Sequence, residues 1–334
     1  MEYRRVGQSG LKVSEICLGT MTFGHGTDAE EAQRMVSLAL DAGVNMFDTA
    51  NSYGDSQSET MLGAALKGRR DQAILATKVF NPTGSGPNDS GSSRLHILRA
   101  VEDSLRRLQT DYIDLYYIHH VDDETPLDET LRALDDLVHQ GKVRYVGCCN
   151  YEAWRLCEAL WISDTRNLAR FVVYQAQYSL VVRDIEEEQV PLCLRKGLGV
   201  VAWSPLAGGF LSGKYQPGER VLAGTRSAEG WVFPERYLAA GADHTLGTLL
   251  QVAADLGRSP AQVALRWVLE QPAVSAAIVG ARTAAQLQDN LQAAGWRLQG
   301  EALQRLNDAS RPPERYPHAL ERTMHERRMA AMKR

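Results

Sequence analysis

Short apolar segments alternate along the chain with longer segments in which apolar residues recur every three or four positions. The longer segments have the spacing of one buried helix face, as Leu98, Val101 and Leu105 illustrate. The short segments are apolar throughout, which is typical of strands covered on both faces of a parallel sheet. We predict eight such strands, at residues 16–18, 44–48, 73–78, 113–118, 143–148, 171–174, 200–203 and 276–279. Eight helices are predicted between and after them, at residues 28–40, 58–66, 95–108, 126–138, 153–160, 185–196, 259–269 and 284–294.

This alternation predicts a single (β/α)₈ TIM barrel, which the length of 334 residues fits better than two unrelated domains. Residues 3–6 and 11–13 flank a turn rich in glycine and predict an N-terminal β-hairpin. One additional helix is predicted at residues 302–309, after the eighth unit. We therefore place the barrel domain at residues 1–310 and a solvated, basic C-terminal tail at 311–334.

Two predicted loops are long, at residues 81–93 and 204–244. The first is rich in Gly, Pro, Asn and Ser, and the second contains several glycines together with Trp231 and Phe233. Long loops in a compact domain are usually functional or disordered. Because both follow strands, we expect both on the face of the barrel where such folds place their chemistry.

Composition excludes several classes of function. The chain is 44% hydrophobic and 23% charged with a net charge of −4, which is typical of a soluble globular protein and gives no sign of nucleic-acid binding. No apolar run approaches the roughly 20 residues that cross a membrane, and the N-terminus lacks the apolar core of a signal peptide. Five cysteines without a Cys-x-x-Cys pair favour reduced thiols in a cytoplasmic protein. The sequence leaves the oligomeric state open.

Ionisable side chains stand at the ends of three predicted strands. Asp48, Lys78 and His119 each end a strand, and Tyr53 follows Asp48 by five residues. Strand ends of this kind meet over one pocket in a (β/α)₈ barrel. A nearby lysine should lower the pKa of a tyrosine, whose ordinary value is about 10. With Asp48 holding Lys78 and His119 donating a hydrogen bond, the set could give a proton to a carbonyl that receives a hydride.

Each of these residues also has a simpler interpretation. Asp48 alone could cap a loop, Tyr53 could be a half-buried aromatic, and Lys78 could be exposed. His119 and His120 could be part of a metal site, but no third ligand is evident, so we predict no metal. Strand alternation should send the two histidine side chains to opposite faces.

Four segments carry a resemblance to the aldo-keto reductase superfamily over about residues 3–310. They are Asp41–Ala50 with Tyr53 and Gly54, then Asp114–His119, then Gly141–Gly147 with Asn150, and finally Gly280–Arg282 with Gln286 and Asn290. The resemblance implies NADPH-dependent reduction of a small carbonyl compound. It also implies Tyr53 as proton donor, Lys78 and Asp48 as the pair that tunes it, and His119 as the orienting donor.

The resemblance further implies where NADPH binds. The chain has no Gly-x-Gly-x-x-Gly after its first predicted strand, so the cofactor site is not of the Rossmann type. The implied cofactor residues are Thr20, Met21, Cys149, Asn150, Gln175, Trp203, Ser204, Leu206, Gly208, Lys214, Gly280, Arg282, Gln286 and Asn290.

Within this set, the resemblance gives each group a task. Asn150 and Gln175 would bond the carboxamide, and Trp203 would stack on the nicotinamide. The segment from Ser204 to Lys214 would cover the pyrophosphate, and Arg282 would bind the 2′-phosphate, since a guanidinium matches phosphate in a fork. Two positions depart from the common pattern. Cys149 stands where a serine is more common, which removes a hydroxyl contact to the carboxamide, and Gln286 stands where an arginine is common, which leaves fewer charges on the 2′-phosphate and implies a modest preference for NADPH.

Two alternatives remain open at the level of sequence. Potassium-channel β subunits share the family and fold, so a nucleotide-binding regulatory subunit is one alternative, although the complete set of four residues favours an enzyme. A barrel aldolase or isomerase with Lys78 as a Schiff base is the other.

Overall fold

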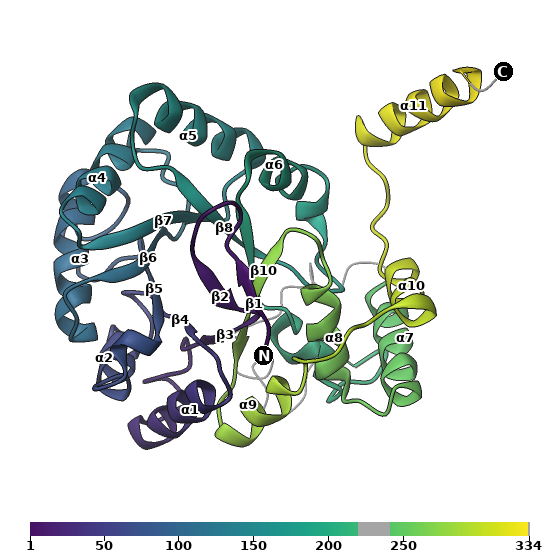
Figure 1. Cartoon of the computed structure of the whole chain (residues 1–334), viewed down its shortest axis with the longest axis horizontal. Coiled ribbons are helices and arrows are strands. Elements are labelled where there is room, and N and C mark those ends of the chain that lie inside the picture. The colour runs from purple at the N-terminus through teal and green to yellow at the C-terminus, as the bar shows by residue number, and fades with distance from the viewer. Residues whose placement is uncertain (220–240, 333–334) are drawn as a thin grey trace.

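The computed structural model describes residues 1–219 and 241–332, and its core is a closed barrel of eight strands (Figure 1). Neighbouring strands are parallel, and β10 pairs with β3 to close the barrel. The strands are β3 (Ile16–Gly19), β4 (Met46–Asp48), β5 (Ile74–Val79), β6 (Ile113–Ile118), β7 (Val143–Cys149), β8 (Phe171–Gln177), β9 (Gly199–Trp203) and β10 (Val274–Gly280). The predicted (β/α)₈ barrel is confirmed.

Helices surround the barrel and bury their apolar faces against it. The eight predicted helices correspond to α1 (Ala29–Asp41), α2 (Gln57–Ala65), α3 (Arg94–Leu108), α4 (Leu127–His139), α5 (Ala153–Arg166), α6 (Gln189–Lys196), α8 (Pro260–Leu269) and α9 (Ala284–Leu291). Local signals fix several helix starts. The side chain of Asp28 accepts a hydrogen bond from the backbone of Glu31 at the start of α1, and Ser259 forms a capping box with Gln262 at α8.

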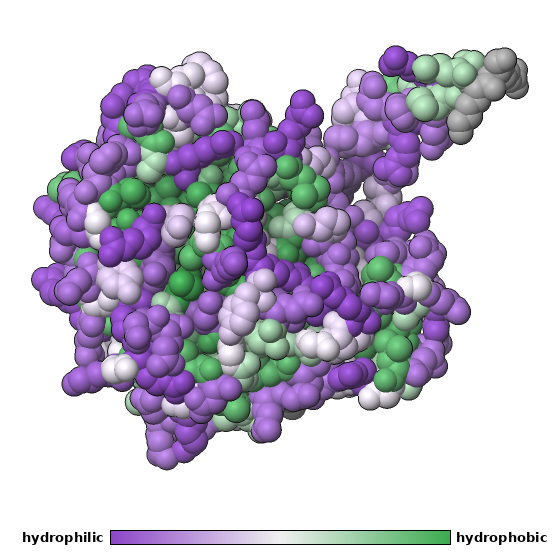
Figure 2. All heavy atoms as spheres, in the orientation of Figure 1, coloured by the Kyte–Doolittle hydropathy of each residue, from purple (hydrophilic) through white to green (hydrophobic). Residues whose placement is uncertain are grey.

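The predicted hairpin is present and closes the end of the barrel at which the strands begin. It consists of β1 (Tyr3–Arg5) and β2 (Lys12–Ser14), which pair antiparallel and lie across the barrel toward the viewer in Figure 1. Val6, Leu11 and Val13 are buried in one cluster with residues of the barrel interior such as Met46. Hydrophilic residues predominate on the outer surface of this face (Figure 2).

The sequence analysis missed two α-helices, one at the end of the loop predicted for residues 204–244 and one, α11 (His318–Met332), in the segment predicted as a tail. The loop predicted for residues 204–244 gives way at its end to α7 (Ala242–Asp255), which packs against α8 and α10 (Gly300–Ala309). Buried Leu246, Leu249, Val252 and Ala253 have helical spacing, so the signal was present. A short 3₁₀ helix, η3 (Ala207–Ser212), lies at the start of the same loop. Trp231 and Phe233 lie outside the described residues.

The C-terminal segment leaves the barrel after α10. It contains α11 (His318–Met332), which projects from the body of the molecule and buries none of its residues (Figures 1 and 2).

Two short 3₁₀ helices complete the described elements. They are η1 (Arg70–Gln72) and η2 (Asp184–Glu186), and η2 lies at the start of the helix predicted for residues 185–196. Within residues 1–219 and 241–332, no helix combines the length and the apolarity that crossing a membrane requires.

Candidate active site

Four side chains from three neighbouring strands meet at the C-terminal end of the barrel. Asp48 ends β4, Lys78 is the penultimate residue of β5, and His119 directly follows β6. The Lys78 ammonium forms an ion pair with Oδ1 of Asp48 and donates to the backbone oxygen of Thr49 at 2.7 Å. It also lies 3.4 Å from the hydroxyl of Tyr53. The structure thus brings the four predicted catalytic residues into one cluster.

A tight turn after β4 places Tyr53. Gly54 has a φ of +56°, and a Cβ atom there would lie 2.5 Å from the backbone oxygen of Phe23. A side chain at residue 54 would therefore clash with a backbone that has little room to move. The turn continues through Asp55 and Ser56, which also have positive φ angles, before α2 begins. Gly54 is thus a geometric requirement of the loop that carries Tyr53.

The electrostatic balance at Tyr53 differs from the sequence-based expectation. Desolvation raises the pKa of Tyr53 above its ordinary value, and the charge of Lys78 opposes this effect only in part. The expected lowering of this pKa is therefore wrong, because loss of hydration outweighs the attraction of the cation. For Lys78, burial acts to lower the pKa, but the surrounding acidic groups, with the adjacent carboxylate of Asp48 first among them, together outweigh burial and raise the pKa. Lys78 is consequently charged at neutral pH.

His119 is held by neighbours on several sides. Its Nδ1 lies 3.4 Å from the side-chain nitrogen of Asn81, and its ring meets that of Tyr53 edge to face, with centroids 5.7 Å apart. His120 stacks on it with ring centroids 4.6 Å apart and 12° between the planes. The expectation that the two histidines face opposite ways is wrong, because β6 ends at Ile118 and strand alternation does not extend beyond it.

A cavity of about 820 Å³ opens above this cluster. It is lined by Asp48, Tyr53 and His119 and by thirteen of the predicted cofactor residues, namely Thr20, Met21, Asn150, Gln175, Trp203, Ser204, Leu206, Gly208, Lys214, Gly280, Arg282, Gln286 and Asn290. Cys149 does not line it, and its side chain is buried in the barrel interior. Lys78 is also fully buried and reaches the cavity through its contacts with Asp48 and Tyr53.

At the catalytic end of the cavity, polar side chains bond one another. The indole nitrogen of Trp203 donates to Oδ1 of Asn150 at 3.0 Å, and Asn150 donates to the backbone oxygen of His119 at 3.1 Å. Asn150 and Ser204 both have left-handed backbones, with φ angles of 61° and 53°. Strained backbones of this kind concentrate at functional sites. They turn the chain at the ends of β7 and β9 and keep these side chains at the cavity.

The loop after β9 forms one wall of the cavity. The Ser204 hydroxyl accepts a hydrogen bond from the backbone of Gly208 at 3.1 Å, and Gly208 and Gly209 both have positive φ angles. Glycines at these positions let the loop turn tightly beside the cavity. Lys214 follows this turn, lines the cavity and is exposed.

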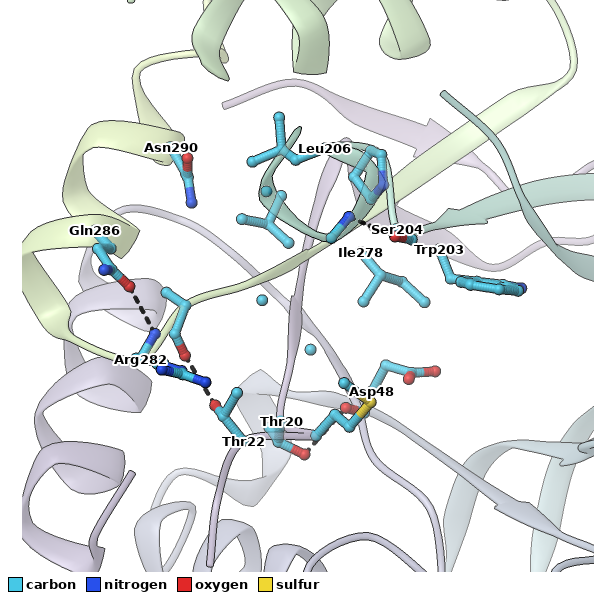
Figure 3. Close-up of a pocket in the computed structure, with 18 of the residues that line it drawn as sticks. Thr20, Thr22, Asp48, Trp203, Ser204, Leu206, Ile278, Arg282, Gln286 and Asn290 are labelled. Carbon is cyan, nitrogen blue, oxygen red and sulfur yellow. Dashed lines mark hydrogen bonds between the residues drawn. The ribbon is translucent and has the colours of Figure 1, made fainter. Parts of the chain in front are cut away.

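The opposite end of the cavity carries Arg282, Gln286 and Asn290, well separated from Asp48 and Trp203 (Figure 3). Gln286 accepts a hydrogen bond from the backbone nitrogen of Arg282 at 2.9 Å, so it shapes the turn before α9. Thr22 donates to the backbone oxygen of Ala281 at 2.8 Å and ties the loop after β3 to this turn. Lys214 and Arg282 are the only lysine and arginine that line the cavity within the described part of the chain.

Sequence reasoning missed several residues of the cavity. Asn81 and His120 line it beside His119, and Thr22 and Asp289 line it near Arg282. His120 directly follows the strand-end residue His119, and Asn81 begins the long loop predicted after the third strand, so their position was a usable signal, whereas nothing in the local pattern singles out Thr22. Within residues 1–219 and 241–332, no group of three or more His, Cys, Asp or Glu side chains is arranged to hold a metal ion.

Comparisons with known proteins agree with this geometry. The model of the aldo/keto reductase family matches residues 15–311. The "Uncharacterized oxidoreductase YrpG" of Bacillus subtilis (strain 168) is 43% identical over 92% of this chain and 95% of its own length. Proteins of Arabidopsis thaliana and Oryza sativa subsp. japonica, each called "Probable voltage-gated potassium channel subunit beta", are 36% identical over 88% of this chain and 91% of their own length. The chain therefore belongs to the aldo/keto reductase family, and it is an NAD(P)H-dependent oxidoreductase.

Proposed function

We propose that this protein reduces aldehydes or ketones to alcohols with NADPH, and that Tyr53 supplies the proton. The observation that carries the proposal is the approach of the Lys78 ammonium to within 3.4 Å of the Tyr53 hydroxyl at the base of an open cavity. A phenol beside a fixed cation can release a proton and leave a tyrosinate that the cation stabilises. Asp48 keeps the cation in place by its ion pair with Lys78.

The residues around the cavity suit an extended dinucleotide. Asn150, Gln175 and Trp203 would hold the nicotinamide end, and the Ser204–Lys214 segment would cover the pyrophosphate. Arg282 lies at the far end, where a guanidinium would bind a 2′-phosphate, and this supports NADPH over NADH. The nicotinamide ring supplies a hydride when it is bound.

The chain's own groups complete the reduction. As a carbonyl carbon gains a hydride, its oxygen gains negative charge, and the hydroxyl of Tyr53 and a ring N–H of His119 can donate hydrogen bonds to that oxygen. Transfer of the Tyr53 proton to the oxygen then gives the alcohol and leaves a tyrosinate beside Lys78. Burial and the charge of Lys78 lower the pKa of His119 well below its ordinary value, so this ring acts as a neutral donor.

The proposed substrate is a small carbonyl compound, and we propose that the protein acts in the cytoplasm. The location is supported by five cysteines with no Cys-x-x-Cys pair, all of them free in the structure.

A regulatory subunit that binds the nucleotide without useful turnover is the second candidate, because the relatives named as potassium channel β subunits are 36% identical to this chain. The presence of all four residues Asp48, Tyr53, Lys78 and His119 favours the enzyme. Steady-state oxidation of NADPH with a panel of simple aldehydes, ketones and sugars separates the two candidates.

The matched control is Tyr53→Phe, which removes one oxygen and hardly changes packing. General acid catalysis is typically worth about 10²–10⁴ in rate, and the same oxygen also holds the forming alkoxide. We therefore expect a loss of kcat at or beyond the top of that range with NADPH affinity nearly intact. If Tyr53→Phe retained more than about a tenth of kcat with cofactor bound, the proton would come from another group.

A further inference from the structure

Gln175, which the resemblance assigns only to cofactor binding, makes a direct side-chain contact with the catalytic cluster. It lies in β8, near the catalytic end of that strand, and its side chain is 3% exposed. Its Nε2 donates a hydrogen bond to Oδ2 of Asp48 at 2.8 Å. Because an ionised carboxylate can only accept, the nitrogen end of the amide must face Asp48.

This contact completes the set of partners around Asp48. Oδ1 of Asp48 is paired with Lys78, and Oδ2 accepts from Gln175. Asp48 is 3% exposed and Lys78 is fully buried, so the carboxylate depends mainly on these protein partners. A buried carboxylate oxygen without a donor is costly, and Gln175 therefore helps to fix the carboxylate that in turn fixes Lys78.

The other end of the amide faces the cavity. Gln175 lines the cavity. Its Oε1 makes no hydrogen bond within the described part of the chain, and this oxygen is not one of the fully buried atoms that lack a partner. An amide oxygen in this position can accept a hydrogen bond from an N–H group of a ligand. The amide nitrogen of Gln175 thus bonds the carboxylate of Asp48, while its amide oxygen faces the cavity in which a ligand would bind.

We propose that Gln175 is a positioning residue that couples the occupied cofactor site to the proton donor. Its Oε1 accepts from the carboxamide of the cofactor, and its Nε2 holds Asp48, which holds Lys78 beside Tyr53. The inference rests on the proposed function for its catalytic part, whereas the contact between Gln175 and Asp48 can be tested without any turnover.

The discriminating variant is Gln175→Glu, which keeps the size of the side chain. When protonated, the new carboxyl group can still donate to Asp48. When ionised, it places a second negative charge against the first, and two carboxylates that share a site hold one proton with a strongly raised pKa. The new carboxyl should therefore lose its proton well above the ordinary value of about 4.3.

The first readout is the melting temperature of the protein without cofactor as a function of pH. Folding raises the pKa of this carboxyl above its value of about 4.3 in the unfolded chain. Between these two pKa values the folded protein must keep a proton that the unfolded chain releases, so the free energy of unfolding falls as pH rises through this interval. Gln175→Glu should show this fall relative to wild type, and Gln175→Leu should be less stable at every pH without it. A Gln175→Glu melting curve that parallels wild type across pH would show that the contact does not exist in solution and would overturn the proposal.

The second readout is kcat at saturating NADPH and carbonyl substrate. We expect a new inflection for Gln175→Glu, with kcat falling more than about tenfold as the shared proton is lost, while the wild type shows none over the same interval. Gln177→Glu is the matched control, because Gln177 lies two residues further along β8 and its Nε2 has no partner in the described part of the chain. It should lack the inflection.

These outcomes distinguish a failure of the positioning role of Gln175 from a failure of the proposed carbonyl reduction. If Gln175→Glu changes only the KM for NADPH and its kcat keeps the wild-type pH profile, Gln175 serves the cofactor alone and the positioning role is overturned. If the wild type turns over no carbonyl compound, the proposed function fails, and the melting curves still decide whether Gln175 holds Asp48.

Discussion

The rings of His119 and His120 stack face to face, with centroids 4.6 Å apart and 12° between their planes. The ring of Phe80 also packs against that of His120 in an edge-to-face arrangement, with centroids 5.5 Å apart. Two stacked imidazoles beside the charged Lys78 disfavour a positive charge on either ring. Burial and then Lys78 lower the pKa of both histidines, and His120 adds to the effect on His119.

The acid side of the pH profile should therefore lack a histidine inflection. A lowered pKa means that His119 stays neutral at pH values where a free histidine, with a pKa of about 6.5, would already be charged. We expect kcat/KM for an aldehyde to stay flat as pH falls through 6.5. Histidine ring signals in NMR should give the same result, with His119 titrating well below pH 6.5. A loss of activity centred near pH 6.5 would contradict a neutral donor.

Asn81 should set which nitrogen of His119 carries the proton. Its side-chain nitrogen can only donate, so the contact with Nδ1 at 3.4 Å makes Nδ1 an acceptor and leaves the proton on Nε2. The same nitrogen lies 3.3 Å from the hydroxyl of Ser52, which fixes the amide from a second side. Asn81→Leu should lower kcat by up to about tenfold, the value of one hydrogen bond.

Asn81→Asp is the sharper test, because it has the same shape and reverses the polarity. A carboxylate accepts from Nδ1–H and would move the proton away from Nε2. At pH 8 this variant should lose more activity than Asn81→Leu, and the ¹⁵N shifts of His119 should change places. Equal activity of the two variants, with unchanged ¹⁵N shifts, would show that Asn81 does not select the tautomer.

Arg282 should distinguish NADPH from NADH. It lines the cavity at the end away from Asp48, and a lost charged contact is worth about 1.5–3 kcal/mol. We expect Arg282→Ala to raise the KM for NADPH by roughly tenfold or more and to leave that for NADH nearly unchanged. Lys214→Ala is the matched comparison, because a contact to the pyrophosphate would weaken both cofactors alike. Equal losses for both cofactors in Arg282→Ala would remove it from the 2′-phosphate site.

The barrel and the cluster of four could be predicted from sequence because their signals are local. Apolar strands buried on two faces have a plain pattern, and the register of parallel strands brings Asp48, Lys78 and His119 to the same end without further information. The roles of the individual cofactor residues stay predictions, although thirteen of the fourteen line one cavity.

Other features depended on relationships that local patterns do not contain. The side to which His120 points depends on where β6 ends. The pKa of Tyr53 depends on the balance between desolvation and the charge of Lys78, and only the packed structure sets that balance. The bond between Gln175 and Asp48 joins residues 127 positions apart in the chain. Helix α7 was missed for a different reason, since its apolar spacing follows directly on a long irregular segment.

Lys78→Met should be nearly as damaging to carbonyl reduction as Tyr53→Phe. In the wild type, desolvation raises the pKa of Tyr53 and Lys78 opposes it. Without the cation the desolvation effect is unopposed, so the pKa of Tyr53 rises further and the phenol becomes a weaker acid. The alkaline limb of the reduction profile should then move to higher pH, because a raised pKa means that the proton is retained longer. Reverse oxidation of an alcohol, which needs the tyrosinate, should be lost most completely at neutral pH.

Asp48→Asn should cost less than Lys78→Met, because Asp48 supports Tyr53 through Lys78 while its own negative charge raises the pKa of Tyr53 and makes the phenol a weaker acid. Its carboxylate is what keeps the buried ammonium charged, against the lowering effect of burial on the pKa of Lys78. The asparagine retains an oxygen that can accept from Lys78, and the backbone oxygen of Thr49 remains at 2.7 Å. Part of the Lys78 population should therefore stay protonated near neutral pH, and activity should fall as pH rises and that proton is lost. The expected order of loss in kcat is Tyr53→Phe, then Lys78→Met, then Asp48→Asn, measured at saturating NADPH and pH 7. An Asp48→Asn enzyme less active than Lys78→Met would mean that Asp48 has a task of its own at the reacting oxygen.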